Sequence, residues 1–265
     1  MRYSINVSIL FTEVPFLERF ARARDAGFSA VELWWPRGED LGATRAAIED
    51  AGVDVVLLNF DAGDMPAGDR GLISDPARRD AFRATVPVAL EFAQAVGCTR
   101  LNALAGHVLP QLERAAQLEL ARENVRFAAD AAAEQGAEVL IEAVNTIENG
   151  PYLLSRTDQA ANFVRSVGRE GVRLQYDAYH MQRMEGNLVA TIERHFDAIA
   201  HVQVADSPGR GQPGTGEINF DYVLGRLEEL GYEGHVGLEY KPSEGDTEAS
   251  LSWLPRELRG SRARA

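Results

Sequence analysis

Four apolar runs in this chain each end in a polar side chain that can bind a cation or move a proton. The four residues are Glu142, Asp177, Gln203 and Glu239, and they follow one another at intervals of 35, 26 and 36 residues. These intervals are close to the length of one strand–helix repeat. A buried carboxylate is costly unless it is paired or coordinated, so three carboxylates and one amide at successive strand ends indicate a cation site.

The chemistry of this set favours a hard cation. Carboxylate and amide oxygens are the ligands that Mg²⁺ and Mn²⁺ prefer, whereas a structural or catalytic zinc site usually contains His or Cys. The sequence therefore predicts Mg²⁺ or Mn²⁺ held by Glu142, Asp177, Gln203 and Glu239. Taken singly, Glu142 could be a solvated acid and Asp177 a helix N-cap, which Asp favours.

Two histidines and two cations are expected to contact a substrate. His180 follows Asp177 by three residues, and His107 follows the fourth predicted strand. Arg210 is the cation of a loop rich in glycine and proline, residues 206–217, and Lys241 comes shortly after Glu239. Because arginine binds a carboxylate through two parallel hydrogen bonds, Arg210 predicts an anionic substrate, although a solvent-exposed loop arginine is the alternative.

The positions of these residues require parallel strands. Strand-like and helix-like segments alternate along the whole chain, and the predicted strands are 3–7, 30–33, 53–59, 100–104, 138–142, 172–177, 201–204 and 235–239. Amphipathic helices are expected at 15–26, 78–96 and 112–135. The pattern predicts an α/β fold with a single (β/α)8 TIM barrel over residues 1–258, followed by a short, frayed basic tail at 259–265. In such a barrel the carboxyl ends of the strands meet at one face, which carries the active site.

Composition excludes several other classes of protein. The 265 residues carry a net charge of −13, which argues against a nucleic-acid partner or an anionic membrane surface. No Gly-x-Gly-x-x-Gly motif follows the first strand, so no nucleotide cofactor is expected. Cys98 is the one cysteine, which excludes an intrachain disulfide. With no long apolar run, the sequence predicts a cytoplasmic protein. A homo-oligomer is possible.

Three long motifs make the chain resemble the hydroxypyruvate isomerase family of xylose-isomerase-like barrels. They are YDAYHMQRMEG at 176–186, GRGQPGTGEIN at 209–219 and GLEYKP at 237–242, and the likeness extends to residues 6–11, 62–64 and 69–71. The resemblance implies interconversion of hydroxypyruvate and tartronate semialdehyde, with Glu142 and Glu239 as proton donor and acceptor. It also adds Arg70 to the expected substrate contacts, in a loop at 59–71 that could cover the site.

The chain departs from the family pattern in two places, and several functions remain open. Asn59 stands where the family is expected to have a histidine, and residues 105–107 differ from its usual loop. A 2-oxo-tetronate isomerase shares most of the motifs. A ketose 3-epimerase would use the same two glutamates on a neutral sugar. An endonuclease would need a larger, histidine-rich metal cluster, and a non-catalytic sugar-acid binding protein would not need both glutamates.

Overall fold

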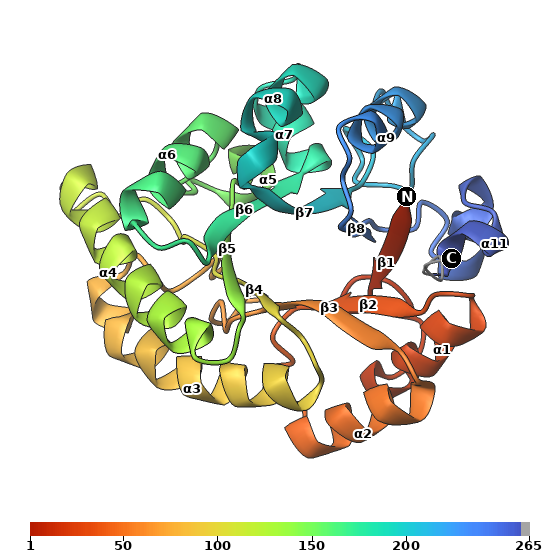
Figure 1. Ribbon diagram of the computed structural model, residues 1–265, viewed down its shortest axis with the longest axis horizontal. Helices are drawn as coiled ribbons and strands as arrows, with labels where there is room; N and C mark the ends of the chain where they lie inside the picture. Colours follow the sequence, from red (N-terminus) through yellow and green to blue (C-terminus); the bar gives the residue numbers. More distant parts are fainter. Residues whose placement is uncertain (261–265) are drawn as a thin grey trace.

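The computed structural model describes residues 1–260 and contains a closed barrel of eight parallel strands in chain order (Figure 1). The strands are β1 (Arg2–Asn6), β2 (Ala30–Leu33), β3 (Asp54–Asn59), β4 (Arg100–Asn102), β5 (Glu138–Glu142), β6 (Val172–Asp177), β7 (Ile199–Val204) and β8 (His235–Leu238). Since β8 pairs with β1, the sheet has no free edge. The predicted barrel is confirmed.

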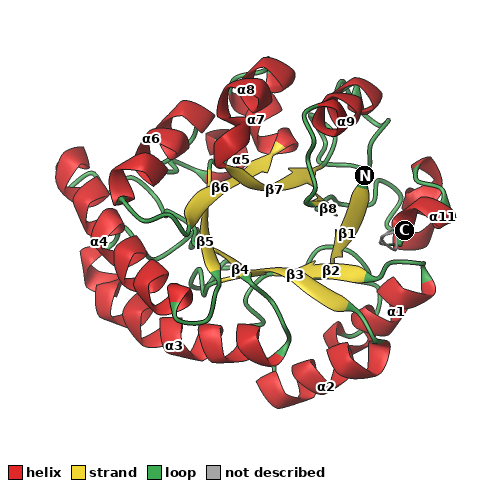
Figure 2. Ribbon diagram, in the orientation of Figure 1, coloured by secondary structure: helices red, strands yellow, loops and turns green. Residues whose placement is uncertain are grey.

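Helices surround the strands on the outside of the barrel (Figure 2). The α-helices are α1 (Arg19–Asp25), α2 (Leu41–Ala51), α3 (Arg79–Ala95), α4 (Arg114–Ala133), α5 (Thr146–Asn149), α6 (Thr157–Val167), α7 (Ala178–Met184), α8 (Leu188–His195), α9 (Phe220–Glu229), α10 (Thr247–Ser250) and α11 (Arg256–Arg259). Short 3₁₀ helices occupy η1 (Phe16–Glu18), η2 (Pro76–Arg78), η3 (Phe196–Ala198) and η4 (Leu251–Trp253). None of the helices among residues 1–260 is long and apolar enough to cross a membrane.

The strands form where the sequence is apolar, because both faces of a barrel strand are covered. All six residues of β7 are buried, and β2 is buried throughout. The register places Asp177 of β6 beside Gln203 of β7, and Glu142 of β5 beside Gln175. The polar ends of these strands therefore come together at one face of the barrel.

Helix ends follow the expected capping chemistry. Asp40 caps α2 by accepting a hydrogen bond from the backbone of Ala43, and the helix ends at Gly52, whose φ of 62° is left-handed. Glycine adopts this conformation with little strain, so the chain can turn here from α2 into β3.

The C-terminal boundary differs from the prediction. Arg259, expected to begin a frayed tail, ends α11 and donates hydrogen bonds to the carbonyls of Leu254, Ala26 and Leu251. These bonds attach α11 to the barrel, so the ordered chain extends beyond residue 258. The remainder of the predicted tail, 261–265, lies outside the described residues.

Candidate active site

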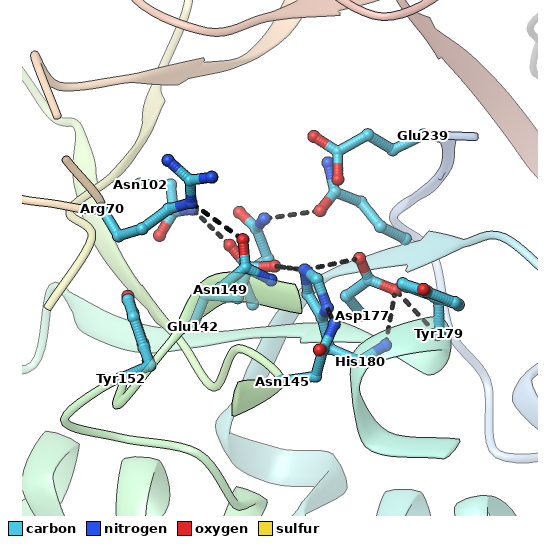
Figure 3. A network of polar contacts seen from close by, with 12 residues as sticks. Arg70, Asn102, Glu142, Asn145, Asn149, Tyr152, Asp177, Tyr179, His180 and Glu239 are labelled. Atoms are coloured by element: carbon cyan, nitrogen blue, oxygen red, sulfur yellow. Dashed lines mark hydrogen bonds and ion pairs between the residues drawn. The ribbon is translucent and has the colours of Figure 1, made fainter. Parts of the chain in front are cut away.

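The ends of β5 and β6 bring three potential ligands together. One ligand atom from each of Glu142, Asp177 and His180 lies within 4.8 Å of the others. His180 Nε2 is 3.6 Å from Asp177 Oδ2 and 3.9 Å from Glu142 Oε1 (Figure 3). All three side chains are buried. This cluster contains two of the four predicted cation ligands.

The two carboxylate oxygens of Asp177 differ in their contacts. Its Oδ1 accepts a hydrogen bond from the backbone N–H of Tyr179 at 2.8 Å and so caps α7. Its Oδ2 is buried and has no hydrogen-bond partner among the described residues. A buried carboxylate oxygen without a partner is unfavourable. Together with the neighbouring Glu142, it fits a bound cation.

Burial determines the protonation of this cluster. It raises the pKa of Glu142 well above its usual range, and the charges of Glu239 and Asp177 raise it further. A hydrogen bond of 2.8 Å from Asn102 Nδ2 to Glu142 Oε2 lowers the pKa of Glu142 and so opposes these effects. Burial also raises the pKa of Asp177. Carboxylates that repel one another in a dry site are the arrangement that a cation would stabilise.

His180 is held in one tautomer. Burial lowers its pKa well below the usual range, with Arg210 adding to the effect, so the ring is neutral. Asn145 Nδ2 lies 2.7 Å from His180 Nδ1, and Asn145 Oδ1 is occupied as the acceptor for the backbone of Glu148. The amide therefore donates to Nδ1, which leaves the proton of His180 on Nε2, facing the carboxylates. This tautomer makes His180 a hydrogen-bond donor rather than a cation ligand.

Glu239 follows β8 and lies outside the three-residue cluster. Its Oε1 accepts from Trp34 Nε1 at 2.6 Å and from Asn6 Nδ2 at 3.1 Å. Its Oε2 accepts from Arg210 Nη2 at 2.7 Å. Burial raises the pKa of Glu239 to about 7, although Arg210 opposes the rise. A carboxyl group with this pKa can take or give a proton near neutral pH.

Arg210 lies among the buried carboxylates and pairs with Glu239. Only 15% of its side chain is exposed, and its guanidinium lies 5.5 Å from the centre of the Tyr179 ring. Burial would lower its pKa, but Glu239, Asp177 and Glu142 raise it overall. The structure thus places Arg210 as the counter-ion of these acids, and the expected contact between Arg210 and an anionic substrate stays a prediction.

The backbone around Arg210 is fixed in an unusual conformation. Its φ is +55°, a left-handed value that non-glycine residues rarely adopt. The carboxylate of Asp206 holds the loop by accepting hydrogen bonds from the backbone of Gly214, Gly216 and Ile218. Strained residues held by their surroundings cluster at functional sites, which agrees with the position of Arg210.

Gln203 is bound into a polar network inside the barrel. Its Nε2 donates to Glu32 Oε2 at 2.8 Å, and its Oε1 accepts from Gln175 Nε2 at 2.6 Å. Glu32 is fully buried and also accepts from Ser4 Oγ at 2.6 Å. His201 Nε2 lies 2.7 Å from Glu32 Oε1. That Gln203 binds a cation stays a prediction, because its amide is already satisfied here.

A cavity of about 330 Å³ opens above these residues. Predicted site residues that line it are Glu142, His180, Arg210, Glu239, Lys241 and Arg70. Met65 and Pro66 of the loop at 59–71 also line it, which agrees with the expectation that this loop covers the site.

The expected substrate contact by His107 is not supported. His107 is absent from the cavity lining, and its Nε2 lies 2.6 Å from the carbonyl oxygen of Asn149. It also forms a β-bridge with Tyr152. The side chain connects the loop after β4 to α5, so it supports the cavity wall from behind.

Several residues that the sequence argument missed contribute to the site. Glu32 stands in an otherwise apolar strand, and an acid at such a position is a usable signal. Trp34, Glu148 and Asn149 line the cavity, but nothing in their local sequence distinguishes them from ordinary loop residues. Only the three-dimensional structure shows that these residues line the cavity.

Comparisons with known proteins agree with this geometry. Residues 20–257 match the family described as xylose isomerase-like TIM barrel. The chain is 39% identical over 254 residues to hydroxypyruvate isomerase of Escherichia coli, covering 96% of this chain and 98% of that protein. It is 39% identical over 253 residues to 2-oxo-tetronate isomerase of Cupriavidus necator, covering 96% and 97%.

A solved structure is also similar. A Brucella melitensis protein described as an AP endonuclease of family 2 superimposes with a TM-score of 0.91 at 40% identity, and the match covers 96% of this chain and 97% of that one.

Proposed function

Because the chain belongs to the xylose isomerase-like TIM-barrel family, we propose that it is an isomerase that interconverts hydroxypyruvate and tartronate semialdehyde. The observation that carries this proposal is the pair Glu142 and Glu239. Both line one cavity, both are buried, and burial raises the pKa of each.

The reaction moves a carbonyl by one carbon without net oxidation. A proton must leave the carbon that carries the hydroxyl group, and a proton must be added to the former carbonyl carbon. A proton must also move from one oxygen to the other. Two proton-transfer groups facing one substrate can perform the exchange at carbon, and we assign these steps to Glu142 and Glu239.

His180 and Arg210 assist at the oxygens. The Nε2 proton of His180 points at the carboxylate cluster, where it can donate a hydrogen bond to a substrate oxygen. Arg210 supplies a fixed positive charge beside Glu239. Donors that are already oriented stabilise the negative charge that develops on oxygen as the C–H proton leaves.

The site fits a divalent cation, Mg²⁺ or Mn²⁺. The orphan oxygen of Asp177 and the raised pKa of Glu142 support this assignment. Glu142 and Asp177 would hold the cation, and Glu239 and Gln203 would complete the set. When bound, it would supply positive charge to the oxygens of the reacting carbons.

A 2-oxo-tetronate is the second candidate substrate. The relative from C. necator is named for this activity, and a cavity of about 330 Å³ has room for a longer acid than hydroxypyruvate. We further propose that the protein acts in the cytoplasm on a small acid, without nucleic-acid or membrane partners, and that it can form a homo-oligomer.

A comparison of kcat/KM tests the proposal. The substrates are hydroxypyruvate, a 2-oxo-tetronate, and the neutral ketohexoses fructose, psicose and tagatose. We expect a short 2-oxo acid to have the highest value. A tenfold preference for a ketohexose would replace the proposal with an epimerase, and nicking of abasic-site DNA without isomerase activity would replace it with an endonuclease.

A further inference from the structure

The cavity above Glu142 contains three cations that differ in how their charge is balanced. Arg210 is paired with Glu239 at 2.7 Å. Lys241 is exposed at the rim. Arg70 is half-buried, lines the same cavity and forms no ion pair with any residue in the range 1–260. The carboxylate of a 2-oxo acid needs a partner, and Arg70 is the cation that has a fixed position and no counter-ion.

Arg70 is held by neutral acceptors only. Its Nε donates to Asn149 Oδ1 at 2.9 Å, and its Nη1 donates to the carbonyls of Met65 at 2.9 Å and Asp69 at 2.7 Å. These bonds orient the guanidinium without neutralising it. No bond from Nη2 is recorded to any described residue, so this nitrogen is available to a ligand.

The acid next to Arg70 in the sequence is occupied elsewhere. Asp69 accepts from Nη2 of Arg78 at 3.1 Å and from the backbone of Asp64 at 2.8 Å. Asp61, in the same loop, is paired with Arg37 at 2.7 Å. The loop therefore neutralises its own carboxylates with other arginines and leaves Arg70 uncompensated.

The backbone at Arg70 is locked against the neighbouring loop. Its carbonyl accepts a hydrogen bond from the backbone of Gly106 at 3.0 Å. Gly71 has φ of +120°, and a Cβ at this position would lie 2.0 Å from the carbonyl oxygen of Leu104. Only glycine permits this approach. The guanidinium is thus positioned before a ligand binds, which reduces the entropic cost of binding.

We infer that Arg70 is the anchor for the carboxylate of a short 2-oxo acid. In the view of Figure 3, Glu142 lies between Arg70 and Asp177, so a substrate anchored at Arg70 extends towards the cluster of potential ligands. The inference rests on the proposed function, because that function supplies the carboxylate. It leaves Arg210 as the counter-ion of the glutamates and makes Arg70 the residue that selects acids over neutral sugars.

Binding of two matched ligands tests the inference. Pyruvate carries the carboxylate but lacks the hydroxyl needed for isomerisation, and dihydroxyacetone is a neutral analogue of hydroxypyruvate. Calorimetry with the Mn²⁺-loaded protein would compare the wild type, Arg70→Gln and Arg70→Lys. We expect Arg70→Gln to weaken pyruvate binding by roughly 10–100-fold, the usual effect of losing a charge-assisted hydrogen bond, and to leave dihydroxyacetone unchanged.

The matched control is Arg37→Ala. Arg37 lies in a neighbouring cavity, is largely exposed and is already paired with Asp61, so this variant should bind both ligands like the wild type. Thermal melting would verify that each variant is folded. If Arg70→Gln fails to fold, Arg70→Lys provides the test, because it keeps the charge but not the planar guanidinium. This variant should show a smaller loss of pyruvate affinity and no loss of dihydroxyacetone affinity.

Unchanged pyruvate binding in Arg70→Gln would overturn the inference. Equal losses for pyruvate and dihydroxyacetone would also overturn it, because a carboxylate anchor does not act on a neutral ligand. The two proposals fail separately. Pyruvate binding that depends on Arg70, without turnover of hydroxypyruvate, would contradict the isomerase alone, whereas turnover with unchanged binding in Arg70→Gln would contradict the anchor alone.

Discussion

Gln203 Nε2 donates a hydrogen bond of 2.8 Å to Oε2 of the fully buried Glu32. This contact fixes the orientation of the amide, because a carboxylate accepts only from the NH₂ end. The oxygen of Gln203 therefore faces away from Glu32 and accepts a hydrogen bond of 2.6 Å from Gln175 Nε2, a donor that a cation would have to replace. Groups that orient a ligand in this way commonly change metal affinity by 10–100-fold when they are replaced.

Replacement of Glu32 by Gln should lower the affinity for Mn²⁺ by about 10–100-fold, since the new amide no longer fixes the orientation of Gln203. Isothermal calorimetry with Mn²⁺ measures this without reference to activity. Asp177→Asn, which alters a proposed ligand, should lower the affinity at least as much. Wild-type affinity in Glu32→Gln would show that the contact with Gln203 has no bearing on the cation.

The space beside Glu32 depends on a glycine in β8. A Cβ on Gly237 would lie 2.0 Å from Glu32 Oε1, and the buried carboxylate has no free space into which to move. Gly237→Ala should therefore lower the free energy of unfolding by about 1–3 kcal/mol, the usual effect of overpacking. Urea denaturation provides the measurement.

Gly225→Ala is the control for this substitution. Gly225 lies within α9, and a Cβ there would contact nothing within 4 Å. Alanine in place of glycine within a helix should raise stability by roughly 0.5–1 kcal/mol where its Cβ meets no neighbour. If both variants changed stability in the same direction, the crowding at Glu32 would not be the cause.

Arg210 balances the charge of Glu239, and its loss should affect turnover. Arg210→Ala leaves a buried carboxylate without its 2.7 Å partner, so the pKa of Glu239 should rise further and the optimum of kcat should move to higher pH. We expect kcat to fall by roughly 10²–10³, as for loss of an oriented charge donor. A change confined to KM would instead indicate that Arg210 acts only in substrate binding.

His235, at the start of β8, should make the fold sensitive to acid. Burial, with contributions from Arg2 and His201, lowers its pKa from 6.5 to about 4. Between these values the unfolded chain binds a proton at His235 and the folded chain does not, so stability falls as the pH falls from about 6.5 to 4.

His235→Gln removes this contribution. The variant should lose less of its unfolding free energy than the wild type when the pH is lowered from 7.5 to 5, as measured by urea denaturation at each pH. Equal losses would mean that other groups, of which His180 is one, account for the acid sensitivity.

The sequence predicted the barrel and the polar strand ends because both depend on local patterns. The sequence offered a cation ligand and a helix cap as alternatives for Asp177. Its Oδ1 caps α7, and its Oδ2, which has no partner among the described residues, leaves the cation role open. The spacing of the strands was enough to predict that Glu142 and Asp177 lie close together, since parallel strands of a barrel end at one face.

Contacts between distant segments could not be predicted in this way. The sequence offered Arg210 as a substrate contact but not as the partner of Glu239, which the closed barrel brings to 2.7 Å from it. His107 was expected to contact a substrate in the cavity, but its side chain is hydrogen-bonded to the carbonyl of Asn149 and lies behind the cavity lining. Such pairings depend on loop conformations that neither periodicity nor composition specifies.

Glu142 and Glu239 are assigned the proton transfers, and the isomerisation rate of Mn²⁺-loaded Glu239→Gln tests this assignment most directly. NMR of hydroxypyruvate in D₂O would report both turnover and incorporation of deuterium at carbon. We predict that kcat falls by roughly 10²–10⁴ and that deuterium is incorporated more slowly than in the wild type. The same result is expected for Glu142→Gln. Metal content measured in parallel separates loss of the cation from loss of proton transfer. Turnover near that of the wild type, with or without bound metal, would contradict the account.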